Sequence, residues 1–279
     1  RDFIKAVIKL NKYNVKLLSQ RWGNTRFGYL NDHNEFGLLS LIVPKADKQP
    51  DIWVQITVPN EFQPVGKYNI GVTAGIETTI VDQTWLQGVN RMNLTLTSSN
   101  HSRDVFHKTN WEVKDNRTGK ITSTVKLEKP VEVLFEGVDL TKYFETKSNI
   151  DLSEIKETFC FLLVGHWLKG EYGHDRKDVG FTIKSFLETF KNKTNPPALI
   201  LKTSSATTSI MDQSAVIGKI DKIKKTVKGK LPSVYVIPGD LTDQEVNELY
   251  NHSKVKAMVT HTKGEGFGRP LLEFSVVGK

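Results

Sequence analysis

Two glutamates and three glycines near the end of the chain have types and spacing that suit a phosphorylated ligand. Glu265 and Glu273 stand eight positions apart, and Gly264, Gly266 and Gly268 surround the first of them. Glycine lets backbone N–H groups approach a phosphate closely, and the start of a helix favours its negative charge. A carboxylate beside such a site needs another partner, such as sugar hydroxyl groups. These residues therefore fit a ligand that carries both phosphates and hydroxyls, as a nucleotide joined to a sugar does.

The residues around this loop predict a strand before it and a helix after it. Residues 257–259 are apolar, as in a strand buried in a parallel sheet, and 271–277 form an apolar helical segment. Pro270 suits the first helical turn, where its missing N–H would have no partner. A strand, a glycine loop and a helix N-terminus in this order form a generic anion site. The alternative is a solvated turn before a surface helix.

The stretch from Glu265 to Glu273, with GFGRPLL between them, resembles the Glu-x7-Glu signature of family 4 retaining glycosyltransferases (glycosyl transferases group 1). The resemblance implies that Glu265 contacts the donor sugar and that Glu273 binds the ribose hydroxyls. It also implies that backbone N–H groups hold the diphosphate, namely those of Gly266, Phe267 and Gly268. Arg269 departs from the pattern, because many members carry an apolar residue there.

A second group of residues resembles the cationic part of the same donor site. Residues 158–164 are continuously apolar, as in a strand buried on both faces, and Gly165 follows them. The basic pair Arg176 and Lys177 then precedes a predicted helix. The resemblance implies that both cations face the diphosphate, where fixed positive charge stabilises the leaving group. Gly165 and Lys202 complete this expected donor site, and the alternative for the basic pair is a solvated loop.

The acceptor side of the expected cleft rests on a broader resemblance between residues 77 and 106. It implies that Glu77, Ser99 and His101 line the cleft. The alternatives are a solvated loop acid for Glu77 and a surface helix-cap residue for His101. The sequence departs from the family pattern at Asn93, where the family has an acid, and at Thr97, where it has a proline.

Length and periodicity predict an α/β protein with two domains. We expect residues 1–150 to form an N-terminal, acceptor-side Rossmann-like domain and residues 151–279 a C-terminal, nucleotide-sugar-binding one. The resemblance implies that the two domains face each other across a cleft, the GT-B fold. We expect a fragment that is incomplete at both ends, lacking the first strand and the C-terminal part. Local patterns predict a helix over 1–12, a strand over 14–19, a surface hairpin or insertion over 111–129, and a capping box of Thr242 and Glu245.

The composition favours a soluble protein with anionic partners. The net charge is +8, and the chain has one cysteine, Cys160, so it forms no internal disulfide and suits a reducing compartment. No apolar run is long enough to span a membrane. Six lysines between 219 and 230 predict a helix with a basic outer face, which is solvated or binds anionic lipid or nucleic acid. We expect a cytoplasmic protein, or one peripheral to a membrane.

The function that the resemblance implies is transfer of a sugar, with retention of configuration, from a UDP- or GDP-linked donor to an acceptor hydroxyl. The acceptor would be a glycan, a lipid-linked sugar or another hydroxyl compound, and no cofactor or metal is expected. The sequence has no Asp-x-Asp triplet and no Gly-x-x-x-x-Gly-Lys-Ser/Thr loop, and its histidines do not suggest a metal cage. The alternatives are a nucleotide-sugar epimerase or phosphorylase on the same scaffold, or a non-catalytic nucleotide-sugar-binding relative.

Overall fold

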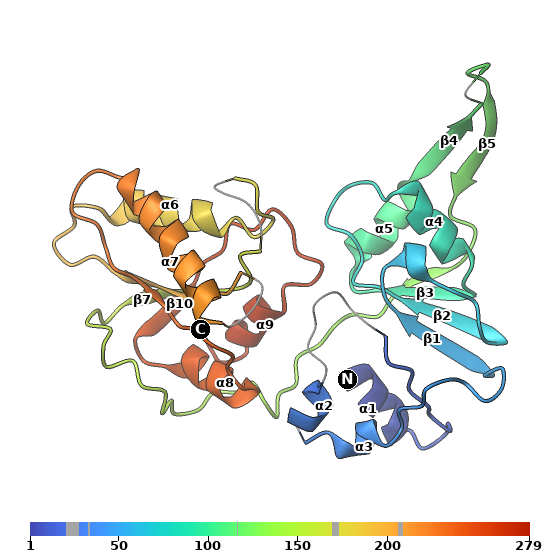
Figure 1. The fold of residues 1–279 in the computed structure, drawn as a ribbon, viewed down its shortest axis with the longest axis horizontal. Helices are drawn as coiled ribbons and strands as arrows, with labels where there is room; N and C mark the ends of the chain where they lie inside the picture. The colour runs from blue at the N-terminus through green and yellow to red at the C-terminus, as the bar shows by residue number, and fades with distance from the viewer. Residues whose placement is uncertain (21–27, 33, 116, 169–172, 206–208) are drawn as a thin grey trace.

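The computed structural model contains two four-stranded parallel sheets, which lie on opposite sides of the molecule in Figure 1. It describes residues 1–279 except 21–27, 33, 116, 169–172 and 206–208. The first sheet has the order β1-β2-β3-β6. This N-terminal sheet unit consists of β1 (Ile52–Ile56), η1 (Pro59–Glu61), β2 (Tyr68–Val72), α4 (Gln83–Asn90), β3 (Leu94–Thr97), α5 (Asn100–Lys108) and β6 (Val131–Val133).

The second sheet has the order β10-β7-β8-β9, so its first strand in the chain lies inside the sheet. Strands are added to one side of β7 and then to the other, and this reversal leaves a crevice at the carboxyl ends of β7 and β10. The C-terminal sheet unit consists of β7 (Cys160–Val164), α6 (Val179–Phe190), β8 (Ala198–Lys202), α7 (Ile210–Lys225), β9 (Val234–Val236), α8 (Asp243–Asn251), β10 (Val255–Met258) and α9 (Arg269–Ser275).

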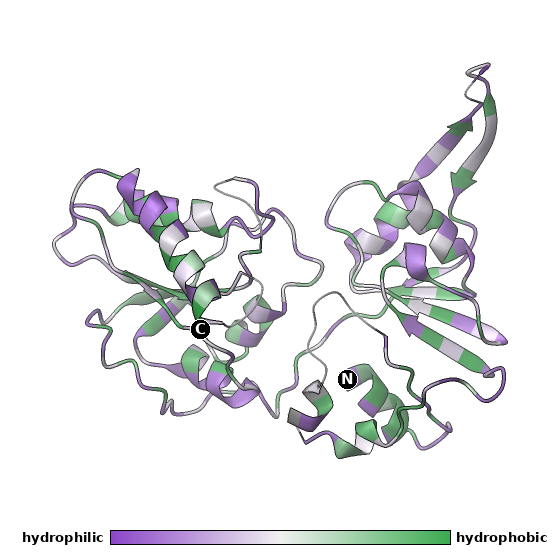
Figure 2. Cartoon of the chain, viewed as in Figure 1, coloured by the Kyte–Doolittle hydropathy of each residue, from purple (hydrophilic) through white to green (hydrophobic). Residues whose placement is uncertain are grey.

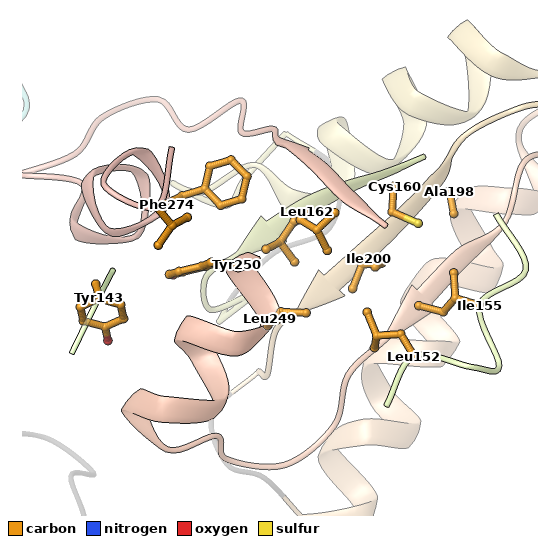
Figure 3. Packing of buried hydrophobic residues seen from close by; sticks show 12 residues of the cluster. Tyr143, Leu152, Ile155, Cys160, Leu162, Ala198, Ile200, Leu249, Tyr250 and Phe274 are labelled. Atoms are coloured by element: carbon orange, nitrogen blue, oxygen red, sulfur yellow. The ribbon is translucent and has the colours of Figure 1, made fainter. Parts of the chain in front are cut away.

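Alternate residues of the second sheet pack against helices on its two faces. Cys160 and Ile200 face a cluster that contains Tyr250 of α8 and Phe274 of α9, which Figure 3 shows. Their neighbours in the strands belong to the cluster formed with α6 and α7, which includes Leu199. Because the side-chain period of a strand is two, a continuous apolar run is what a doubly covered sheet requires.

Three expectations about local structure meet different outcomes. The hairpin within 111–129 is confirmed as the antiparallel pair β4 (Asn110–Lys114) and β5 (Ile121–Lys126), which projects away from its sheet unit (Figure 1). The capping box is confirmed, since Thr242 and Glu245 exchange hydrogen bonds at the start of α8. The strand over 14–19 is wrong, because residue 17 makes only an isolated bridge with residue 42.

The described residues among the first fifty include three short helices, which lie below the N-terminal sheet unit in Figure 1. They are α1 (Asp2–Lys9), α2 (Tyr29–Asp32) and α3 (Phe36–Leu39). The expected helix over 1–12 is confirmed as α1, although none of its residues is buried. Within the described ranges, no helix is long and apolar enough to cross a membrane.

Candidate active site at the boundary between the sheet units

Arg176 and Lys177 both lie against the Glu265 carboxylate. Lys177 Nζ donates a hydrogen bond to Glu265 Oε1, and Arg176 Nη1 lies 3.6 Å from Glu265 Oε2. The Lys177 and Glu265 side chains are 21% and 20% exposed, so water screens their attraction only in part. The same Arg176 nitrogen donates to the Gly264 carbonyl oxygen at 2.6 Å and to Glu77 Oε1 at 3.3 Å. Residues predicted from separate motifs therefore form one ionic cluster, which Glu77 joins from the other sheet unit.

Two glycines of the loop allow the sheet units to approach each other closely. A Cβ atom at Gly264 would lie 2.5 Å from the Cβ atom of Glu77, and one at Gly266 would lie 3.2 Å from the Ala74 carbonyl oxygen. The Oγ atom of buried Ser98 lies 2.7 Å from the Ala74 carbonyl oxygen and 3.1 Å from that of Gly266. The contact between the sheet units therefore requires glycine at Gly264 and leaves little room for a side chain at Gly266, whatever the loop binds.

The last glycine of the loop begins α9 and borders a small pocket. Gly268 is the N-cap residue of α9 with φ of 80°, in the left-handed region that favours glycine. In the part of the chain that the structure describes, the N–H groups of Gly266, Phe267 and Gly268 donate to no acceptor. The pocket beside them is lined by Lys177, Glu265 and Gly268, with Val164 at the end of β7 and Met258 at the end of β10. The Lys177 charge and the backbone of Gly268 thus meet at the crevice of the second sheet.

An aromatic pair closes one side of the same loop. The ring of Phe267 meets the edge of Phe135, which follows β6, with 5.1 Å between ring centroids. Phe135 is 70% exposed. The pair joins the connection between the two sheets to the glycine loop, and the sequence pattern had assigned a role only to the backbone of Phe267.

Glu273 is buried and paired in the structure, unlike Glu265. Its side chain is 9% exposed and accepts a hydrogen bond from Arg269 at 3.0 Å, one turn earlier in α9. Tyr250 of α8 donates to its other oxygen at 3.3 Å. Burial raises the pKa of Tyr250, and the nearby Glu273 charge raises it further. Arg269, whose role the sequence left open, is thus the ionic partner of Glu273, and binding of ribose by Glu273 stays a prediction.

Gly165 and Lys202 lie at the carboxyl ends of adjacent strands. A Cβ atom at Gly165 would lie 3.8 Å from the Lys177 side chain, which places this glycine beside the cationic cluster. Lys202 Nζ instead donates to the Gly239 carbonyl oxygen at 2.5 Å, in the loop after β9. Burial lowers the pKa of Lys202, although the Asp240 carboxylate acts in the opposite direction. Lys202 therefore lies at the same edge of the sheet as Lys177 but contacts a different loop.

Ser99 and His101 have structural partners in the first turn of α5. Ser99 is the N-cap residue, and its Oγ accepts a hydrogen bond from the Ser102 N–H at 3.2 Å. His101 Nε2 lies 3.1 Å from the carbonyl oxygen of Thr78, and its side chain is exposed. The N-cap residue of α5 is therefore Ser99 and not His101, whose ring contacts a loop before α4. An acceptor-binding role for either residue stays a prediction. Among the described residues, no group of three His, Cys, Asp or Glu side chains could hold a metal ion.

Two solved structures share this architecture at low sequence identity. One is an Escherichia coli structure described as trehalose-6-phosphate bound with UDP-2-fluoro glucose, with a TM-score of 0.53 and 13% identity. The other is the apo structure of OtsA, with a TM-score of 0.53 and 12% identity. Each alignment covers 90% of this chain and 60% of the other chain. The chain therefore has the α/β GT-B fold with Rossmann-like sheets, and it spans about 60% of the length of these structures.

Other comparisons add no family. The N-terminal domain of a Candida albicans trehalose-6-phosphate phosphatase aligns with a TM-score of 0.47 and 14% identity, a likeness too weak to support a conclusion. No protein-family model matches the chain, and no curated protein matches it.

Proposed function

We propose that the protein transfers a sugar from a nucleotide-sugar donor to an acceptor hydroxyl. The observation that carries this proposal is the cluster of Arg176, Lys177 and Glu265 beside a glycine loop at the crevice of a parallel sheet. Ligands of open α/β sheets bind outside the carboxyl ends of the strands at such a crevice. Two cations and the loop N–H groups suit a diphosphate, and the carboxylate suits sugar hydroxyls.

In this mechanism the two cations and the loop amides take the charge that develops on the departing nucleoside diphosphate. A donor that binds there must first separate Lys177 from Glu265, since the two side chains now pair with each other. The freed Glu265 carboxylate would then accept hydrogen bonds from the sugar. We propose that the acceptor oxygen bonds to the anomeric carbon on the face that the diphosphate leaves, and that its proton passes to the departing phosphate oxygen. The anomeric configuration is then retained. Because the two cations hold the diphosphate charge, we propose that no metal is required.

Binding of the donor is tested by thermal shift with a panel of UDP- and GDP-sugars. UDP-glucose leads the panel, because a solved structure of this fold is described as bound with UDP-2-fluoro glucose. We expect one donor to raise the unfolding temperature of the wild type. Lys177→Met should lower its affinity by about ten- to a hundredfold, from the loss of one charged hydrogen bond. Lys191→Met, which removes the ion pair with Glu188 at the far end of α6, is the matched control.

Turnover is then measured as release of nucleoside diphosphate in the presence of glycans, lipid-linked sugars and simple sugar acceptors. The anomeric configuration of the product, read by NMR, tests retention, and activity in a chelator tests metal independence. Isomerised donor without transfer would indicate an epimerase, and phosphate-dependent cleavage would indicate a phosphorylase. Donor binding without any turnover would indicate a non-catalytic relative. If a folded protein binds no nucleotide sugar, the proposal is wrong.

A further inference from the structure

We propose that the outer face of α7 docks on an anionic phospholipid bilayer. This face, here called the α7 face, points away from the cluster that packs on the second sheet. It consists of Ile210, Met211, Ile217, Lys222 and Lys225, followed after the helix by Lys228 and Lys230. The proposal concerns where the protein acts and is independent of its reaction.

The apolar part of the α7 face is unusually exposed. Ile210 and Met211 are 83% and 84% exposed, more than any other large hydrophobic side chain that the structure describes. Ile217, two turns later on the same side, is 44% exposed. Single exposed apolar residues are normal on a protein surface, whereas several that share one helix face indicate an interaction site.

Helical geometry sets these residues apart from the buried side of α7. Val216, Ile220 and Ile223 pack toward α6 and the sheet. At 100° per residue, Ile210 and Ile217 lie about 20° apart, roughly 100° from the centre of that buried stripe. The helix is therefore fixed on the protein by one apolar stripe and presents a second apolar group to solvent.

The charged part of the α7 face follows the apolar part along the helix. Figure 2 shows α7 passing from green and white near its start to purple toward its end. Lys222, Lys225, Lys228 and Lys230 are exposed, and the one acid among residues 219–230 is Asp221. Lysines attract anionic headgroups by about 1 kcal/mol each near the membrane surface, while apolar side chains enter the boundary of the acyl chains.

The composition of the α7 face favours a bilayer over nucleic acid. Lysines alone can contact phosphates, but proteins that bind single strands add aromatic rings that stack on bases, and arginine is the commonest reader of base edges in duplex DNA. Residues 209–230 contain no aromatic residue and no arginine. Exposed Ile and Met side chains beside lysines are what a lipid interface uses.

The test is co-sedimentation of the whole chain with phosphatidylcholine vesicles, with and without phosphatidylglycerol, at about 0.1 M salt, where charges act over about 10 Å. We expect binding only to the anionic vesicles. Replacing three lysines (Lys222→Gln, Lys225→Gln, Lys228→Gln) should lower the partition coefficient about 100-fold. Replacing Ile210 and Met211 by serine should lower it at least about tenfold. The matched controls leave it unchanged: Lys45→Gln, Lys48→Gln and Lys129→Gln for charge, and Ile121→Ser for an exposed apolar residue.

Several results would overturn the proposal. One is absence of binding to both vesicles by the folded wild type. Another is equal loss in the charge control, which would mean diffuse attraction by the net charge. Binding to duplex DNA that depends on the lysines but not on Ile210 and Met211 would assign the α7 face to nucleic acid. Self-association that the serine variant abolishes would assign it to a second copy of the chain.

Discussion

At the scale of single residues, the two glutamates of the motif differ in what surrounds them. Glu265 lies in the cationic cluster beside the pocket, whereas Glu273 is enclosed between α8 and α9 by Arg269 and Tyr250. A carboxylate that is buried with two hydrogen-bonding partners contributes to stability, because removing it leaves both partners unsatisfied. Glu273 therefore has a structural role in this chain, in addition to the ribose-binding role that the sequence resemblance predicts.

We predict that Glu273→Leu destabilises the protein by about 1–3 kcal/mol, because the half-buried Arg269 charge and the Tyr250 hydroxyl lose their partner. Glu273→Gln should cost less, since an amide oxygen still accepts hydrogen bonds. Urea unfolding measures both, and the double variant Glu273→Leu with Arg269→Leu should recover part of the loss. Equal stability of the wild type and Glu273→Leu would show that the buried pair contributes nothing.

At the scale of elements, Gly88 and Gly218 lie well inside the helices α4 and α7, and they do so for different reasons. A Cβ atom at Gly88 of α4 would lie 1.7 Å from the Pro59 carbonyl oxygen, so η1 packs directly on the α4 backbone. A Cβ atom at Gly218 of α7 would have no heavy atom within 4 Å. The first glycine is needed by packing, while the second only weakens its helix.

We therefore predict that replacing glycine by alanine changes the stability in opposite directions at these two positions. Gly218→Ala should stabilise the protein by about 0.5–1 kcal/mol, the difference in helix preference between the two residues. Gly88→Ala should lower stability despite that gain, because α4 and η1 must separate. Both effects are measured from the midpoint of urea unfolding, provided that the dependence of the unfolding free energy on urea concentration is the same in all variants. A stabilising Gly88→Ala would contradict the packing of η1 on α4.

The connection between the sheets is tied to α8 by an ion pair that depends on pH. Burial acts to raise the pKa of Asp243, but the hydrogen bond and charge of Lys142 outweigh it, so the pKa lies below its usual range. The unfolded carboxyl, with a pKa of about 4, thus binds its proton at higher pH than the folded one. The pair stabilises the fold above that value, and the stability is lost as pH falls through the lower folded pKa.

We predict that Asp243→Asn lowers stability at pH 7 and leaves it almost unchanged well below pH 4, where the wild-type carboxyl is also protonated. Urea unfolding across this range measures the difference. Asp221→Asn, on the exposed side of α7, is the control. A wild type and an Asp243→Asn variant that lose stability in parallel on acidification would refute the prediction.

At the scale of the whole molecule, the two sheet units meet at the same residues that form the candidate donor site. Arg176 of the C-terminal unit bonds to Glu77 of the N-terminal unit, and Ser98 contacts Gly266. A ligand that attracts Arg176 must compete with Glu77 as well as Glu265. Binding of an anion in the pocket is thereby linked to the contact between the units.

We predict that Glu77→Gln raises the affinity for a nucleoside diphosphate several-fold, because one competing carboxylate is removed. The stability should change by less than about 1 kcal/mol, since the Arg176 and Glu77 side chains are 51% and 31% exposed. Calorimetric titration with UDP or GDP and a thermal melt measure the two quantities. Unchanged or weaker binding would mean that Glu77 does not oppose the ligand, and the conservative variant Glu77→Asp tests whether its charge alone matters.

Sequence patterns were most reliable where the signal was local. The strand before the glycine loop, the helix after Pro270 and the box at Thr242 follow from neighbouring residues and are present in the structure. The failed strand over 14–19 shows the limit, because a strand needs a ladder partner that its own residues do not reveal.

Contacts between distant segments could not be predicted from the sequence. Nothing near Gly264 and Gly266 indicates that Glu77 and Ala74, from the other sheet unit, press against them. The sequence indicates only one of the two partners of Glu273. Arg269 stands four positions away, a spacing typical of a helical ion pair, whereas Tyr250 belongs to another helix.

The modification rate of the chain's single thiol can be used to measure how often the second sheet opens. Cys160 begins the central strand β7, is fully buried, and has a pKa that burial raises. A thiol-specific reagent needs both access and thiolate, so it should modify the native protein only when β7 separates from its neighbours. The modification rate would then report how often this sheet opens. Slowing of that rate by a nucleotide sugar would measure ligand binding without any catalytic assay.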